Sequence, residues 1–206
     1  MALDNSIRRY IDPPVERLAG VLARAGINAD AVTLAGFALG ALAAGAIALQ
    51  WYGAGLVLIL VSRLCDGLDG AVARASGGGT DRGGYLDIVL DFAFYGLIPL
   101  GFVLADPAAN GVAGAVLLTA FYVNGASFLA FALVKEKRGV TDMARGRKSF
   151  IYSIGLMEAT ETLATFVLAC LFPVWFAVIA FVAAGLTILT TLVRISEAWG
   201  AFGTDR

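Results

Sequence analysis

The chain has 206 residues, of which 59% are hydrophobic, whereas a soluble domain has about 45–50%. Its mean hydropathy is +0.82, and its net charge of −1 argues against a nucleic-acid partner. The absence of histidine removes imidazole catalysis and most zinc sites. Cys65 and Cys170 both lie in apolar runs, which predicts small core residues and no disulfide framework. We therefore expect a single all-α membrane domain over residues 1–206.

The first predicted element is an amphipathic helix over residues 5–25, NSIRRYIDPPVERLAGVLARA. Its apolar residues recur near the helical period, and its arginines occupy other positions. A basic helix of this kind is typical of the membrane surface, and a soluble linker helix is the alternative. Because the N-terminus is polar and basic without a short cleavable apolar core, we expect no signal peptide.

Six apolar segments follow, each long enough to cross a bilayer, which takes roughly 20 residues. They lie near residues 31–51, 54–74, 84–105, 110–136, 151–171 and 173–197. This pattern predicts a polytopic six-helix transmembrane bundle over residues 31–197, preceded by the interfacial helix.

Basic residues predict the orientation of these spans. They occur before the first span, after the second, after the fourth and at the C-terminus, whereas the other three connections hold no Lys or Arg. The alternation places both termini, and the hairpin between the second and third spans, on the cytoplasmic side of a bacterial-type inner or plasma membrane. The basic loop 135–149 has two interpretations. It either reflects this topology alone, or it binds an anionic ligand at the cytoplasmic surface, which would be lipid head groups or an acceptor substrate.

The most informative stretch is residues 66–91, DGLDGAVARASGGGTDRGGYLDIVLD. Its four carboxylates are Asp66, Asp69, Asp87 and Asp91. The first two are three residues apart and the last two are four apart, so each pair shares one face of a helix. A Gly-rich reversal over residues 76–84 would turn the two helices antiparallel, so that the pairs can face each other.

Acids in a membrane segment usually mark a functional site. Oxygen ligands without histidine suit Mg²⁺ or Mn²⁺, and a cluster this dense suits two ions and phosphoryl-type displacement. Gly70 and Ala73 share the face of Asp66 and Asp69 and leave room for a ligand, while Arg74 at its polar end could grip a phosphate. The stretch therefore predicts a metal-bound phosphate ester at the membrane's edge.

Arg63 lies inside the second span, about one turn before Asp66. Its guanidinium could pair with a carboxylate, bind the acceptor substrate of a transfer reaction, or extend toward the membrane–water interface. Structural pairing is the favoured interpretation.

The spacing Asp-x2-Asp-Gly-x2-Ala-Arg-x8-Gly-x3-Asp-x3-Asp is met at every position from Asp66 to Asp91, with Gly83 as its central glycine. It resembles the signature of the CDP-alcohol phosphotransferases, integral-membrane enzymes of phospholipid head-group synthesis. The resemblance implies transfer of a phosphatidyl group from a CDP-activated donor, CDP-diacylglycerol or a similar CDP-alcohol, to an alcohol acceptor, with release of CMP. It also implies a homodimer in membrane lipid. We expect Gly83 to give the backbone the freedom that the reversal needs.

By the same resemblance, Asp66 and Asp87 bridge two Mg²⁺ or Mn²⁺ ions, Asp69 holds the first ion, and Asp91 holds the second and acts as the catalytic general base. The implied contacts to the CDP donor are Asp30, Ala31, Val32, Thr33, Gly70, Ala73, Arg74 and Thr80. An N-terminal cap from Asn28 or Asp30 would also explain the polar segment before the first span.

The sequence determines the alcohol acceptor less well than the donor or the metal site. The nearest resemblance is to the phosphatidylinositol-phosphate-synthase-like branch, which carries Gly-Phe-Ile-Glu-Arg-x-Glu-Arg in the fifth span. Here the segment reads GLMEATET, so Glu158 and Glu161 are kept while Ala159 and Thr162 replace both arginines. This favours an uncharged, zwitterionic or lipid-like alcohol over a phosphorylated polyol. The two glutamates either bind the acceptor or pair with basic residues of the loop 135–149.

Two other functions are compatible with an acidic cluster in a membrane protein. One is a cation-coupled transporter that uses the four aspartates as an ion site, but such proteins often show internal repeats and sites near the midplane. This chain shows no repeat, and its acids adjoin a loop. The other is a catalytically silent scaffold of the same fold, which the intact motif argues against.

Overall fold

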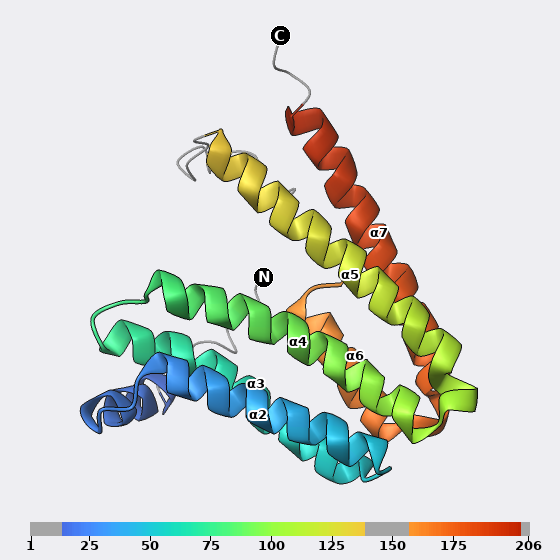
Figure 1. Ribbon diagram of the computed structural model, residues 1–206, viewed down its shortest axis with the longest axis horizontal. Coiled ribbons are helices and arrows are strands. Elements are labelled where there is room, and N and C mark those ends of the chain that lie inside the picture. The colour runs from blue at the N-terminus through green and yellow to red at the C-terminus, as the bar shows by residue number, and fades with distance from the viewer. Residues whose placement is uncertain (1–13, 139–156, 203–206) are drawn as a thin grey trace. The chain divides into compact units, whose positions relative to one another are not determined.

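The computed structural model describes residues 14–138 and 157–202. In these ranges the chain forms helices joined by short connections, without a strand (Figure 1). The helices are α2 (Ala29–Ala48), α3 (Tyr52–Ala75), α4 (Asp81–Ala105), α5 (Pro107–Lys137), α6 (Ala159–Leu171) and α7 (Phe176–Phe202), with a 3-10 turn at Pro173–Trp175 before α7. Residues 14–24 are also helical. The prediction of an all-α fold is confirmed.

Four stretches are long and apolar enough to cross a membrane: α2, α4, α5 and the stretch Pro173–Phe202 that contains α7. The protein is therefore an integral membrane protein. Helix α3 has 24 residues, but it carries four charged residues from its midpoint onward, Arg63, Asp66, Asp69 and Arg74. Helix α6 has 13 residues, and most of the predicted segment before it lies outside the described residues. The count of six spans stays a prediction.

The tertiary contacts divide the chain into two compact units, residues 1–101 and residues 102–206. The first unit holds residues 14–24, α2, α3 and most of α4, and the second holds the end of α4 with α5, α6 and α7. The single-domain organisation stays a prediction.

Small residues in the first unit let α2 approach both α3 and α4. A Cβ atom added at Gly36 would lie 2.9 Å from Cys65 Cβ on α3, and one added at Gly40 would lie 2.5 Å from the ring of Phe94 on α4. The hydroxyl of Ser62 donates to the Gly36 carbonyl at 2.7 Å, which also ties α3 to α2. Close backbone approach through glycine is typical of membrane helix packing.

The helical residues 14–24 pack one face against this unit. Ala19 is buried in a cluster with Val32 of α2 and Val72 of α3, whereas Arg17 and Arg24 are exposed. Residues 14–24 thus have one buried side, while the predicted amphipathic helix over residues 5–25 stays a prediction. Its position at a membrane surface stays a prediction, and residues 5–13 lie outside the described part of the chain.

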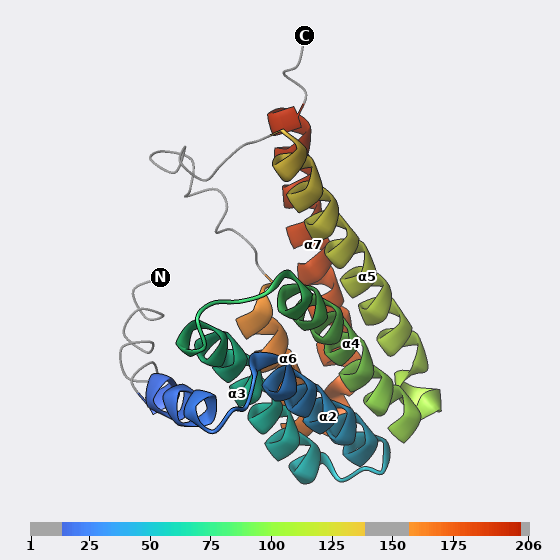
Figure 2. The ribbon, with the colours of Figure 1, turned by 60° about the vertical axis from the view of Figure 1, so that its left-hand side comes forward.

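In the second unit, α5 and α7 lie side by side in both views (Figures 1 and 2). The Nη1 atom of Arg194 on α7 donates to the carbonyl and side-chain oxygens of Asn124 on α5, at 3.2 and 2.8 Å, and to Ser127 Oγ at 3.1 Å. Nearer the C-terminal ends, Arg138 donates to the Phe202 carbonyl at 3.0 Å. These pairs show that α5 and α7 run in the same direction.

Candidate active site

The candidate site lies where α3 turns back into α4. Helix α3 ends at Ala75 and α4 begins at Asp81, so the reversal is residues 76–80, shorter than predicted. Gly77 and Gly78 have φ angles of 102° and 123°, in the left-handed region that glycine enters without steric cost. The hydroxyl of Thr80 accepts a hydrogen bond from the Gly83 backbone nitrogen at 3.0 Å, which caps the start of α4.

The predicted role of Gly83 is wrong. Gly83 lies inside α4 and has no positive φ, so it supplies no unusual backbone conformation. A Cβ atom there would lie 3.1 Å from Asp30 Oδ1 and 3.2 Å from Thr80 Oγ1. The glycine instead leaves space for the Asp30 carboxylate beside the first turn of α4.

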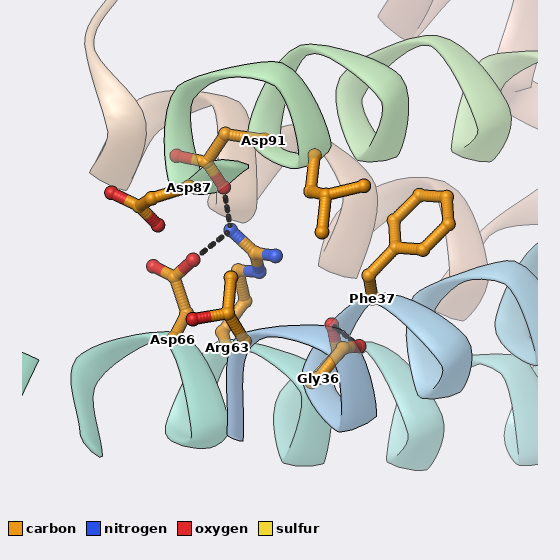
Figure 3. Close-up of a pocket in the computed structure, with 9 residues that line it drawn as sticks. Gly36, Phe37, Arg63, Asp66, Asp87 and Asp91 are labelled. Carbon is orange, nitrogen blue, oxygen red and sulfur yellow. Dashed lines mark hydrogen bonds and ion pairs between the residues drawn. The ribbon is translucent and has the colours of Figure 1, made fainter. Parts of the chain in front are cut away.

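Three of the four predicted carboxylates converge on one small cavity. Asp66 comes from α3, and Asp87 and Asp91 come from α4; all three line the cavity together with Thr33 and Arg63. Figure 3 shows the three carboxylates grouped around the end of the Arg63 side chain. The helical spacing and the reversal therefore bring these acids together as predicted.

The fourth carboxylate has a different partner. Asp69 is 7% exposed, and its Oδ2 accepts a hydrogen bond from the Thr33 hydroxyl at 2.6 Å. A bond this short to an ionised acceptor is among the stronger ones in proteins. Thr33 thus connects α2 to the acidic face of α3.

Arg63 provides the positive charge at the centre of the site. Its Nη1 atom lies 2.7 Å from Asp91 Oδ1 and 3.3 Å from Asp66 Oδ1. Its guanidinium carbon lies 3.8 Å from the centroid of the Phe94 ring, within the range of a cation–π contact. The favoured interpretation of Arg63 as a structural partner of a carboxylate is confirmed.

Phe94 was not foreseen as a member of the site. It follows Asp91 by three residues on α4, so the two side chains lie on the same helical face. Its ring is fully buried, and the Arg63 guanidinium packs over the face of this ring. An aromatic residue three positions after a functional carboxylate is the signal that could have pointed to it.

The donor set of the cavity fits a hard divalent cation. It offers the carboxylates of Asp66, Asp87 and Asp91 and the hydroxyl of Thr33, all of them oxygen ligands of the kind that Mg²⁺ and Mn²⁺ take. Across residues 14–138 and 157–202, however, no three acidic or cysteine side chains are placed to hold a metal ion. Arg63 stands between the carboxylates instead, and the predicted ligand set and number of ions stay predictions.

The residues at the start of α2 have different structural positions. Asn28 Oδ1 accepts from the Ala31 nitrogen at 2.8 Å, so Asn28 is the cap of this helix. Asp30 lies near the hairpin, with Oδ2 3.4 Å from Arg82 Nη2. Ala31 is exposed, whereas Val32 packs in the hydrophobic cluster.

On α3, Arg74 lies close to Gly70, as predicted. A Cβ atom at Gly70 would lie 3.5 Å from Arg74 Nη1, so the guanidinium extends back along this helix. Ala73 is half-buried next to it. The small residues leave the Arg74 side chain room on this surface.

Glu158 and Glu161 form a capping box at the start of α6. The Glu158 side chain accepts from the Glu161 backbone, and the Glu158 nitrogen donates to Glu161 Oε2 at 3.1 Å. This accounts for the pair structurally, although the usual sequence signature of a capping box has Ser, Thr, Asp or Asn at the first position, so Glu158 gave no such signal. Their predicted role in acceptor binding stays a prediction.

Comparison with known proteins gives the class of the chain. Residues 27–193 match the family described as CDP-alcohol phosphatidyltransferase. The chain belongs to this family and is a transferase of substituted phosphate groups in phospholipid biosynthesis.

Individual relatives are similar to the chain over different shares of its length. The chain is 48% identical to inner membrane protein YnjF of Escherichia coli, over 98% of this chain and 96% of that protein. It is 39% identical to an archaetidylinositol phosphate synthase of Methanothermobacter thermautotrophicus over 46% of this chain and 45% of that protein. With a phosphatidylinositol phosphate synthase of Mycolicibacterium smegmatis, the identity is 49% over 33% of this chain and 31% of that protein.

Solved structures share the fold. The chain resembles the Mycobacterium tuberculosis phosphatidylinositol phosphate synthase PgsA1 in complex with manganese and citrate, with a TM-score of 0.69 and 24% identity over 93% of this chain and 92% of that one. The same enzyme with CDP-DAG bound gives a TM-score of 0.67 and 24% identity, over 93% of this chain and 97% of that one.

Proposed function

We propose that the protein transfers a phosphatidyl group from CDP-diacylglycerol to an alcohol and releases CMP. The observation that carries this proposal is the convergence of Asp66, Asp87 and Asp91 on one cavity at the α3–α4 hairpin, in a chain whose residues 27–193 match the family. The bound CDP-DAG and the manganese in the two PgsA1 structures support the same donor and the same kind of cation.

The proposed reaction is a single displacement at phosphorus. The hydroxyl oxygen of the acceptor forms a bond to the β-phosphorus of the donor, the bond from that phosphorus to the bridging oxygen breaks, and CMP leaves with the electron pair. Asp91 accepts the hydroxyl proton as general base. Asp91 Oδ1 is bonded to Arg63 in the structure, so the proton would go to the other oxygen, Oδ2, or to Oδ1 once this contact opens.

The carboxylates that would hold Mg²⁺ or Mn²⁺ are Asp66, Asp69, Asp87 and Asp91, with two ions as predicted from the family resemblance. Divalent cations bound there would neutralise the diphosphate and the charge on departing CMP. The Thr33 hydroxyl donates to the Asp69 carboxylate at 2.6 Å and would help to fix its orientation for a cation.

The donor would lie across the α3 face beside Gly70. Arg74 is positioned to contact a phosphate oxygen, because its guanidinium lies 3.5 Å from the place of a Gly70 Cβ atom and guanidinium groups match phosphate geometry. Asp30 and Thr80 border the same hairpin through Gly83. Ala31 and Ala73 complete this surface, while burial leaves Val32 a packing role.

The acceptor in this proposal is an uncharged, zwitterionic or lipid-like alcohol. Ala159 and Thr162 stand where the related branch has arginines that would bind an acceptor phosphate. Glu158 and Glu161 offer carboxylates that can accept hydrogen bonds from hydroxyls or an amine. The proposed location is a bacterial inner membrane, as the name of the YnjF relative indicates, with the termini and active site cytoplasmic and the protein a homodimer.

The direct test is metal-dependent release of CMP. Purified protein is incubated with CDP-diacylglycerol, Mn²⁺ or Mg²⁺, and a panel of alcohols that includes inositol phosphate and zwitterionic and lipid-like acceptors. CMP release that requires both the metal and one alcohol supports the proposal and identifies the acceptor. Absence of CMP release with every alcohol, in protein that binds Mn²⁺, would refute the proposed reaction.

A matched pair of variants tests the role of the carboxylates. Asp91→Asn should abolish CMP release, whereas Asp81→Asn should not, because Asp81 is exposed at the start of α4 and lines no part of the cavity. Both variants remove one negative charge from the same helix. Equal activity of the two would show that the position of the charge does not matter and would contradict the assignment of Asp91.

A further inference from the structure

Arg63 has a position that the proposed reaction does not use. One nitrogen, Nη1, makes both carboxylate contacts, at 2.7 Å to Asp91 and 3.3 Å to Asp66. The guanidinium plane is supported by the buried ring of Phe94 at 3.8 Å. The arginine therefore stands where the acids from two different helices meet.

We propose that Arg63 is an internal counter-ion that competes with the divalent cation for Asp66 and Asp91, and so sets the cation concentration at which the site fills. This inference rests on the proposed function, because it assumes that these carboxylates bind Mg²⁺ or Mn²⁺.

Electrostatics explains why a counter-ion is needed. Three carboxylates that share a cavity repel one another unless a positive charge lies among them. The Arg63 side chain is only 15% exposed, so water screens this pairing less than it would at a surface. In the absence of a cation, Arg63 keeps α3 and α4 together at their acidic faces.

The geometry of the pairing indicates that it can be displaced. A tightly held arginine binds a carboxylate through two nitrogens in parallel, whereas Arg63 contacts both Asp91 and Asp66 through the single atom Nη1. Its Nε atom is buried and has no hydrogen-bond partner, which makes the bound position less favourable. A site evolved only for structure would be expected to satisfy this atom.

The two cations compete because they need the same oxygen atoms. Arg63 Nη1 already occupies Asp91 Oδ1 and Asp66 Oδ1, and the room left beside it is about 10 Å³, enough for about one water-sized group. A divalent ion that takes these two oxygens as ligands has to displace the guanidinium. Filling the site therefore requires Arg63 to leave Asp91, and the same movement frees Asp91 Oδ1.

The test is the affinity for Mn²⁺, measured by calorimetry on the purified wild type and on Arg63→Gln, without substrate. Removing a competing cation from a partly buried site should lower the Kd for Mn²⁺ by about tenfold or more, which is at least about 1.4 kcal/mol. The matched control is Arg82→Gln, which removes the same charge from the same hairpin. Arg82 is 83% exposed and contacts Asp30, not the cavity, so its Kd should equal that of the wild type.

Thermal unfolding in chelator gives a second readout. Arg63→Gln should unfold at a lower temperature than the wild type without metal, because the carboxylates lose their counter-ion, and Mn²⁺ should restore its stability. Unchanged or weaker Mn²⁺ binding by Arg63→Gln would overturn the inference. If that variant cannot be purified folded, Arg63→Lys replaces it: a compact ammonium stacks less well on Phe94, so Mn²⁺ should again bind more tightly, and equal or weaker binding overturns the inference.

Failure of the inference can be separated from failure of the proposed function. Asp87→Asn should weaken Mn²⁺ binding if the carboxylates form the metal site at all. Binding that depends on Asp87 but is unaffected by Arg63→Gln refutes only the competition. Binding that is absent from the wild type, or indifferent to Asp87→Asn, refutes the metal site itself.

Discussion

Replacement of Gly40 by alanine tests whether close packing of α2 on α4 supports the active site. A Cβ atom at Gly40 would lie 2.5 Å from Phe94 Cδ2, 3.0 Å from Cε2 and 3.2 Å from Ser62 Oγ. Phe94 is completely buried, so its ring cannot move aside without disturbing its neighbours. Overpacking of this kind costs about 1–3 kcal/mol.

The proper reference is Gly45→Ala on the same helix. A Cβ atom at Gly45 meets nothing within 4 Å, so that variant only gains the better helix propensity of alanine, worth about 0.5–1 kcal/mol. Both variants share this gain, so the difference between their free energies of unfolding gives the cost of the steric clash alone. It should be about 1–3 kcal/mol, which corresponds to roughly 2–12 °C in Tm for a chain of this size.

The assay is thermal unfolding of both variants in the same detergent, followed by measurement of CMP release. Gly40→Ala should have the lower Tm and the lower activity, because a displaced Phe94 shifts α4, which also carries Asp87 and Asp91, away from its place beside α2. If Gly40→Ala unfolds at or above the temperature of Gly45→Ala, the described contact between α2 and α4 is refuted.

Three further predictions concern polar contacts. Asp91→Asn should abolish CMP release while binding of CDP-diacylglycerol, measured by calorimetry, stays largely intact; turnover at the wild-type rate would exclude Asp91 as the base. Thr33→Val removes the hydrogen bond to Asp69 and should lower the free energy of unfolding by about 1.5–3 kcal/mol, as measured by chemical denaturation; an unchanged value would show that this bond is not formed. Asn124→Ala removes one of the two side-chain acceptors of Arg194 and leaves Ser127 Oγ, and it should cost about 1–3 kcal/mol in the same measurement; a neutral effect would mean that α5 and α7 are held by other contacts.

The sequence was sufficient to predict which carboxylates come together. Spacings of three and four residues place acids on one helical face, and a Gly-rich reversal between the pairs allows the faces to meet. The structure confirms this for Asp66, Asp87 and Asp91, whereas Asp69, the fourth predicted member, pairs with Thr33 instead. The pairing of Arg63 with a nearby carboxylate followed from the same periodicity.

Contacts between helices were beyond this kind of inference. Helical periodicity orders residues around one helix but leaves open how neighbouring helices are rotated and shifted against each other. The bond from Thr33 to Asp69 and the contact from Gly40 to Phe94 depend on that rotation. Gly83 was misinterpreted for a related reason: a glycine after a loop suggests a turn, and only the position of Asp30 shows that it provides space.

The short connection between α3 and α4 has a consequence for how the enzyme can vary. Surface loops usually tolerate added or lost residues, but each residue inserted before a helix rotates that helix by about 100°. One extra residue in 76–80 could therefore turn Asp87 and Asp91 away from Asp66, although no site residue would be altered. The length of this loop therefore determines whether the carboxylates of the two helices can meet. Natural or designed variants should exchange residue types in this segment far more readily than they change its length.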